Sequence, residues 1–501
     1  MINLTGPLEP FTPAWWLKRL LSKLSALTPH YDALDAYYRG VAPVPVGSNK
    51  EVRAAYGRLM SMSRTNFAEL VIDATRERMM PLGFRTGASD DENGDAEAWR
   101  IWQANTLDAD CDLVHTPQLA MGAAYAIVGP VDEAIGAPLI TAEDPRQVTV
   151  ELEPGRRRVV RAALKLYRDE VTGWDRAYLF LPGVVYRLGR QRSTTTTYDT
   201  NYGPNFGWRS TVEMEPVPST ASDWEEIDEP QMLPPGVGVP VVPFLNKPDA
   251  RFVPSAEIEG HLGLLDRINY TLLNRVEIAT LQAFRQRAVK GVPDRDEHGN
   301  EIDYDDVFAM DPGALWVLPE TAELWESGQV DLTPLRAAIR DDAQDLAAVT
   351  RTPLYYLTPD AANGSAAGAS LSREGLIFKV SDRIRQASQS WEQVMSLAFR
   401  FEGDTERADQ SGMQVMWASP ERYSLAERAD AAAKAIVGGV PWRTVMSSIW
   451  QYSPQEIERM EAERMTDALV ESLREPAVST QQAVSSATAP PVPTNNGAFI
   501  A

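Results

Sequence analysis

Residues 255–283, SAEIEGHLGLLDRINYTLLNRVEIATLQA, carry the strongest structural signal in the chain. Their apolar side chains recur every three or four residues, which is the spacing of one face of an α-helix. Ser255 suits the start of such a helix, and Glu257 and Glu259 suit its positive N-terminal end. The pattern predicts a long helix with one apolar seam, formed by Ile258, Leu262, Leu265, Ile268, Leu272, Val276, Ala279 and Ala283.

A compact segment separates this helix from a second one. Pro293 and Gly299 end the helical rhythm, and the apolar run at 314–318 is typical of a strand. Pro334 suits the first turn of a returning helix that extends to about Arg351. The sequence therefore predicts two helices that flank a small insertion.

The negative charge of the chain is concentrated in this insertion and in the start of the second helix. Between Asp296 and Asp345 there are 14 acidic residues and only two basic ones, so this stretch carries −12 of the net charge of −22. One interpretation is an ordinary solvated face; the other is an acidic surface shared by many copies of the chain. The acidic residues that we select as candidates are Asp303, Asp305, Asp306, Glu320, Glu323, Asp341, Asp342 and Asp345.

Small residues follow the second helix, at Pro359–Ser370, and predict a mobile loop. Within it, Asn363, Gly364, Ser365 and Gly368 would let the backbone come close to a bound polymer. A third long amphipathic helix is expected from Leu371 to Gly403. If the helix seams lack a sufficient partner within one chain, copies of the chain would cover them, and we assign this role to Leu265, Leu272, Ile384 and Trp391.

The remaining regions differ in their side-chain patterns and therefore in the secondary structure that they predict. The first hundred residues predict mainly helices, at 14–38, 66–80, 96–106 and 113–124. Short β-rich runs at 148–152, 159–167, 177–181 and 184–188 predict an antiparallel sheet, followed by a surface excursion at 193–228. A strand at 413–417, several helices at 425–473 and a polar, disordered tail at 476–501 complete the expectation of a mainly helical α+β fold.

The composition excludes several kinds of chemistry. A net charge of −22 has the wrong sign for a protein that binds nucleic acid by neutralising its phosphates. A single cysteine, Cys111, excludes an intramolecular disulfide. The chain contains no phosphate-binding loop, and no pair among its 70 acidic residues is singled out for catalysis. The longest apolar run, 119–129, is too short to span a membrane. We therefore predict no catalytic residue, no metal site, no cofactor and no membrane contact.

The order of elements resembles the central part of the portal proteins of tailed double-stranded DNA phages, in which a helix, an acidic insertion, a returning helix, a small-residue loop and a long helix follow one another. Four short segments are also similar to that family, in particular to siphoviruses that infect actinobacteria. They are Tyr37-Tyr38-Arg39-Gly40, Asn66-Phe67-Ala68-Glu69-Leu70-Val71-Ile72-Asp73, Gly122-Ala123-Ala124-Tyr125 and Ser255-Ala256-Glu257-Ile258.

The resemblance implies a portal fold and a division of the chain into regions. These are a wing at 1–254, a first stem helix at 255–292, a clip at 293–332, a second stem helix at 333–353, a tunnel loop at 354–370, a channel-lining helix at 371–403, a wing return strand at 404–420, crown helices at 421–475 and a disordered tail at 476–501.

The resemblance also implies a non-enzymatic ring, of about a dozen subunits, at one capsid vertex. Double-stranded DNA would pass through it without sequence specificity. The expected partners are the major capsid protein, a head-tail adaptor, the terminase motor and a scaffolding protein, with assembly in the host cytoplasm and residence in the virion. Two alternatives stay open: another virion structural protein, such as a capsid or tail component, and a carboxylate-dependent hydrolase.

Overall fold

A computed structural model describes residues 8–41, 62–88, 94–169, 171–191, 224–283, 287–292, 295, 298–299, 322–326, 328, 330–358 and 366–474. The chain divides into two compact units, Met1–Arg422 and Tyr423–Ala501. Each unit is described by itself. The predicted excursion at 193–228 lies largely outside the described residues, as do the strand at 314–318 and the tail at 476–501.

The N-terminal part of the first unit is helical, as predicted. Its helices are α1 (Pro13–Tyr38), α3 (Phe67–Arg76), α4 (Ala96–Ala104), α5 (Leu107–Asp110) and α6 (Asp112–Ala120). Thr12, Asn66 and Asp95 cap α1, α3 and α4 by accepting bonds from backbone N–H groups.

Two predicted helices in this part were too long. Helix α3 ends at Arg76, four residues before the predicted end at Met80, and the strand β1 (Pro81–Arg85) follows, in which Pro81 pairs with Trp417 of the distant β13 (Gln414–Trp417). Helix α6 ends at Ala120, before Gly122 turns the chain with a φ of +87°.

The predicted antiparallel sheet is present. Its central strands are β4 (Val148–Glu153), β5 (Arg156–Asp169), β6 (Trp174–Leu181) and β7 (Val184–Gln191), in the order β4-β5-β6-β7, and β8 (Glu225–Glu226) and β9 (Gln231–Met232) pair with β7. A separate three-stranded sheet has the order β10-β2-β3, formed by β2 (Ala123–Asp132), β3 (Ala137–Glu143) and β10 (Val241–Leu245).

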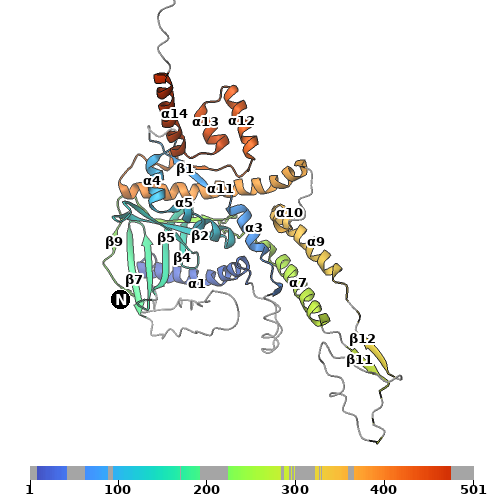
Figure 1. Ribbon diagram of the computed structural model, residues 1–501. Helices are drawn as coiled ribbons and strands as arrows, with labels where there is room; N and C mark the ends of the chain where they lie inside the picture. Colours follow the sequence, from blue (N-terminus) through green and yellow to red (C-terminus); the bar gives the residue numbers. More distant parts are fainter. Residues whose placement is uncertain are drawn as a thin grey trace, which may run out of the picture. The chain divides into compact units, whose positions relative to one another are not determined.

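The β4–β7 sheet is the middle of three layers. Alternate side chains of β5 point to opposite faces, as in any strand. Leu164 and Leu166 pack against α1, whereas Ala163 packs against β2 and β10. An irregularity in the pairing of β5 with β4, between Val160 and Ala162, brings Val160 to the same face as Ala163. Figure 1 shows α1 running along this sheet.

The long helix α11 (Ala366–Glu402) is the centre of the main core. It packs on β2, β10, β3 and β13, and it is buried on nearly every side from Ser390 to Phe399. It begins at Ala366, five residues earlier than predicted, because the alanines at 366 and 367 are strong helix formers and extend the helix into the expected loop.

The predicted helix pair is also present, with different ends. A 3-10 turn, η1 (Glu259–His261), precedes α7 (Leu262–Ala283), so α7 begins later than Ser255 and ends before β11 (Arg287–Lys290). Strand β11 pairs with β12 (Glu323–Glu326), and α9 (Thr333–Thr350) returns to the short helix α10 (Leu354–Leu357). Helices α7 and α9 lie side by side (Figure 1).

The second unit is helical, as predicted. Its elements are α12 (Leu425–Val437), α13 (Trp442–Val445), the π-helical segment η4 (Met446–Trp450) and α14 (Pro454–Arg474). Ser424 and Glu427 form a capping box at the start of α12, and Gly438 and Gly439 end it. In the described residues, no helix combines the length and apolar character needed to cross a membrane.

His115 is a buried, uncharged group in the main core. Its Nε2 accepts a bond from Trp391 Nε1 at 3.3 Å, and Gln118 Oε1 lies 3.2 Å from Nδ1. Burial lowers the pKa of His115 to about 4, although the bond to Gln118 and the charge of Asp112 oppose this shift. His115 therefore takes up a proton near pH 6.5 in the unfolded chain, but only near pH 4 in the folded chain.

This difference predicts that the folded chain becomes less stable as the pH is lowered. Between pH 6.5 and about 4 the unfolded state binds more protons, so the free energy of unfolding should fall by about 3 kcal/mol as the pH drops through this window. Chemical denaturation of the parent and of His115→Gln, above pH 6.5 and near pH 4, measures the effect. The loss should be smaller in His115→Gln, and an equal loss in both proteins would contradict the assignment to His115.

Candidate functional site

The four short segments that suggested a family come together in pairs. Gly40, with a φ of +67°, lies so close to Asn66 that a Cβ there would be 3.1 Å from the Asn66 side chain. Asn66 Nδ2 donates to the carbonyl oxygen of Tyr38 at 2.9 Å. The segments 37–40 and 66–73 thus form one junction, in which Asn66 both caps α3 and holds the end of α1.

This first junction holds α7. Tyr37 Oη donates to the carboxylate of Asp266 at 2.9 Å, and the amide oxygen of Asn269 accepts a bond from the backbone N–H of Thr65 at 3.1 Å. Burial, followed by the bond to Asp266, raises the pKa of Tyr37 to about 12, so its hydroxyl stays protonated and donates.

The second junction joins segments 122–125 and 255–258. A Cβ on Gly122 would lie 3.0 Å from the backbone of Ser255 and Ala256, so only glycine lets the two segments pass at this distance. The backbone N–H of Glu257 donates to the carbonyl oxygen of Leu119 at 2.9 Å. The chain that leads into α7 is therefore fixed against the end of α6.

Glu257 is the buried carboxylate at this second junction. Arg383 Nε lies 2.5 Å from Glu257 Oε1, Asn246 Nδ2 donates to the same oxygen at 3.0 Å, and Lys247 Nζ lies 3.8 Å from Oε2. Burial by itself raises the pKa of Glu257, but Arg383, and then Lys247 and Lys379, lower it to about 2. The carboxylate is therefore ionised across the neutral range.

Lys379 lies one helical turn before Arg383 on α11 and reaches a different segment. Its Nζ donates to the carbonyl oxygen of Thr350, the last residue of α9, at 3.0 Å. Burial lowers the pKa of Lys379 to about 8, while the charge of Glu257 opposes the shift. Arg383 and Lys379 thus connect α11 to the chain on either side of the α7–α9 pair.

The residues assigned to an interface between copies lie in the chain's own core. Trp391 is fully buried, and its ring centroid lies 4.8 Å from those of Trp102 and Phe244. Leu265 and Leu272 are buried in the same core cluster, and Ile384 packs against that cluster. This corrects the reason for assigning them to subunit contacts, because the single chain already supplies partners from α4, α9 and β10.

On α9, which carries part of this acidic stretch, the charges are nearly balanced, since Asp341, Asp342 and Asp345 stand against Arg336 and Arg340. Asp342 and Asp345 lie 2.7 and 3.5 Å from Arg267 of α7. Asp341 on α9 is exposed, close in sequence to the exposed Arg336 and Arg340. Glu323 is exposed on β12, whereas Asp303, Asp305, Asp306 and Glu320 lie outside the described residues.

Of the predicted tunnel loop at 354–370, the structure describes only the two ends, and both contain helix, since Leu354–Leu357 forms α10 and α11 begins at Ala366. Gly368 belongs to the first turn of α11, because that helix begins at Ala366. Asn363, Gly364 and Ser365 lie outside the described residues.

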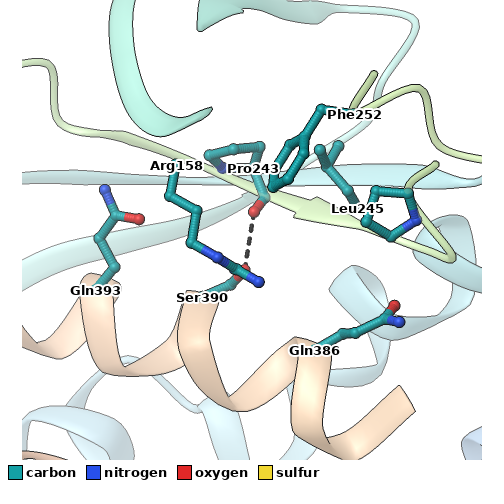
Figure 2. Close-up of a pocket in the computed structure, with 8 residues that line it drawn as sticks. Arg158, Pro243, Leu245, Phe252, Gln386, Ser390 and Gln393 are labelled. Carbon is teal, nitrogen blue, oxygen red and sulfur yellow. Dashed lines mark hydrogen bonds between the residues drawn. The ribbon is translucent and has the colours of Figure 1, made fainter. Parts of the chain in front are cut away.

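A small cavity lies between α11, β5 and β10. Figure 2 shows Arg158 and Phe252 on one side and Gln386, Ser390 and Gln393 on the other. Ser390 Oγ donates to the carbonyl oxygen of Pro243 at 2.9 Å. The cavity volume of ≈ 20 Å³ has room for about one water molecule, so it suits a solvent site rather than an organic ligand.

Sequence reasoning missed the partners of Glu257. It interpreted that residue as an acid at a helix N-terminus, although α7 begins five residues later. A signal was present: Lys379 and Arg383 are four residues apart and lie next to Val380 and Ile384 in the apolar rhythm of α11. Cations at such positions face the interior and require a buried partner.

The family model and the curated relatives that this chain matches point to the same family. The model of the family described as "Phage portal protein, SPP1 Gp6-like" matches residues 17–468. The portal protein of Mycobacterium phage D29 is 27% identical over 395 residues, which cover 75% of this chain and 73% of that protein. The portal protein of Mycobacterium phage L5 is 26% identical over 394 residues, with the same coverage. Among solved structures, a chain in the neck of an empty GTA particle aligns with a TM-score of 0.40 and 9% identity, over 74% of this chain and 89% of that one.

Proposed function

The chain belongs to the SPP1 Gp6-like family of phage portal proteins, and we propose that about a dozen copies close into a ring that passes double-stranded DNA at one capsid vertex. The observation that carries this proposal is the family match, which spans both units up to residue 468 and includes the whole α7–α9 pair. As a portal protein, the chain is a virion component with a structural role, and we propose that it has no enzymatic activity.

We assign the regions of the ring as follows. Helices α7 and α9 form the stem, and the segment between them, with β11 and β12, forms the clip. The helices and sheets before α7, with β13, form the wing, and the second unit forms the crown. The segment at 359–365 is proposed as the tunnel loop, with its small residues close to DNA.

The burial of α11 limits its proposed channel role to one half of the helix. Exposed side chains alternate with buried ones from Glu374 to Gln389, among them Phe378 and Arg385. Beyond this point, up to Phe399, nearly all side chains are buried in the core. We therefore propose that only the N-terminal half of α11 faces the channel.

The proposed partners follow from this position in the particle. The clip would contact the head-tail adaptor and the terminase motor, the wing and crown would contact the major capsid and scaffolding proteins, and the DNA would pass without sequence-specific contacts. Assembly would take place in the host cytoplasm.

The ring is tested by the mass of the purified assembly. We expect a single species of about twelve times the subunit mass of 55.4 kDa, in keeping with a closed head-to-tail ring. Native mass spectrometry or light scattering gives this mass, and negative-stain images should show an axial hole. A protein that stays monomeric under all conditions would contradict the ring, and large assemblies without a hole would favour another virion structural protein.

A further inference from the structure

We infer that Arg383 and Lys379 are positioning residues. Two ties, the ion pair of Arg383 with Glu257 and the bond of Lys379 to Thr350, hold the entry to α7 and the exit from α9 against α11, so that the helix pair and the N-terminal half of α11 move as one body. This inference concerns the folded subunit. Its consequence for a channel rests on the proposed function.

The geometry places the two ties one turn apart on a single helix. Arg383 binds Glu257, two residues before η1 leads into α7, and Lys379 binds the last carbonyl group of α9. The next turn continues this face, since Gln386 Oε1 accepts a bond from the backbone N–H of Lys247 at 3.1 Å. One face of α11 therefore holds the entry to α7, the exit from α9 and the segment after β10.

The charges make the first tie strong. Arg383 and Lys379 are both buried, with Lys247 nearby, and Glu257 is the buried carboxylate that these cations share. Asp382, which also binds Arg383, is far more exposed. If Glu257 loses its charge, or Arg383 is removed, a buried ion is left without its main partner, which is among the most destabilising local changes in proteins.

The second tie acts through a helix end. The carbonyl oxygen of Thr350 belongs to the last turn of α9, where no further helical N–H group can reach it. Arg351 follows with a φ of +53°, so the chain leaves the helix at this point. The ammonium group of Lys379 satisfies this carbonyl and complements the negative end of the helix dipole.

Hydrogen exchange of the full-length chain, resolved by peptide, tests the two ties separately. In Arg383→Met we expect amide exchange to rise by about 100-fold in the first turns of α7. In Lys379→Met we expect a rise of about tenfold, confined to the last turns of α9. Exchange in β5, β6 and β7 should stay unchanged in both variants, because neither tie reaches that sheet.

The controls separate positioning from a general loss of stability. Arg385→Met removes an exposed arginine from the same helix and should change none of these peptides. Arg383→Lys keeps the cation and should restore most of the protection of α7 if charge pairing is the cause. Should Arg383→Met not fold, Glu257→Gln breaks the same tie with an isosteric side chain and should give the same pattern.

Two results would overturn the inference. Unchanged exchange in α7 and α9 would show that the ties do not hold the pair, and an equal rise in the β5–β7 sheet would show a merely global effect. The mass of each sample, measured in parallel, reports on the ring. A failure of the ring proposal therefore leaves the exchange result interpretable.

Discussion

Replacing Trp391 with alanine is expected to lower the free energy of unfolding by about 3–5 kcal/mol, the usual cost of truncating a buried aromatic side chain. Trp391 is fully buried, packs edge-on against Trp102 and Phe244, and donates to His115. Its removal leaves a cavity and an unpaired acceptor at the centre of the main core. Chemical denaturation followed by far-UV circular dichroism, at one fixed protein concentration, measures the loss.

The matched control is Phe378→Ala on the same helix. Phe378 is 63% exposed, so its truncation should change the free energy of unfolding by less than about 0.5 kcal/mol. The contradicting result is a Trp391→Ala protein with parental stability that fails to form rings. That outcome would place Trp391 at a contact between copies, as its position in the sequence first suggested.

We propose that the exposed face of α9, in the stem, lies along the DNA path. Reversing the charge of Asp341 and Asp345 to lysine is then expected to stop most heads from filling with DNA. The exposed surface of α9 already carries Arg336 and Arg340, so the change converts a nearly balanced face into a strongly basic one. Each phosphate that a new lysine contacts should add about −0.9 to the slope of log affinity against log salt, and tight binding resists sliding. The number of filled heads and the length of DNA they retain measure the effect.

A matched control carries the same change in total charge elsewhere. Glu133 and Glu229 are exposed in the sheet-bearing part of the chain, and their double replacement by lysine should leave filling unchanged if charge on α9 is what matters. Ring mass must be parental in both variants, since Arg267 keeps Asp342 as a partner. Parental filling in the α9 variant, with intact rings, would remove this face from the DNA path.

Higher salt should partly restore filling in the α9 variant. At 0.1 M salt, interactions between exposed charges more than about 10 Å apart are largely screened, and this distance shortens as the ionic strength rises, so electrostatic retention of DNA weakens. A filling defect that does not respond to salt would point to a distorted helix pair instead.

Periodicity determined the kinds of elements more accurately than their ends. The helix around Leu265 and Leu272 and the strands at 148–188 could be predicted from local side-chain patterns, because these patterns do not depend on distant partners. The start of α11 was misplaced although its cause, the helix propensity of Ala366 and Ala367, is local. The start of α7 was misplaced because it depends on contacts across the fold. One example is the close passage of Gly122 against Ser255, which keeps the chain out of a helix until η1.

The order of a helix, an acidic insertion, a returning helix and a long third helix could be predicted from side-chain patterns alone, as could the portal-like segments, with which the family match agrees. Which apolar seams lie inside the subunit, and which charges are paired, became visible only in the folded chain. Apolar spacing states that a face is buried, but it does not say by which surface. The burial of Trp391 and the ion pair between Glu257 and Arg383 join residues more than a hundred positions apart, so they exist only once the chain has folded.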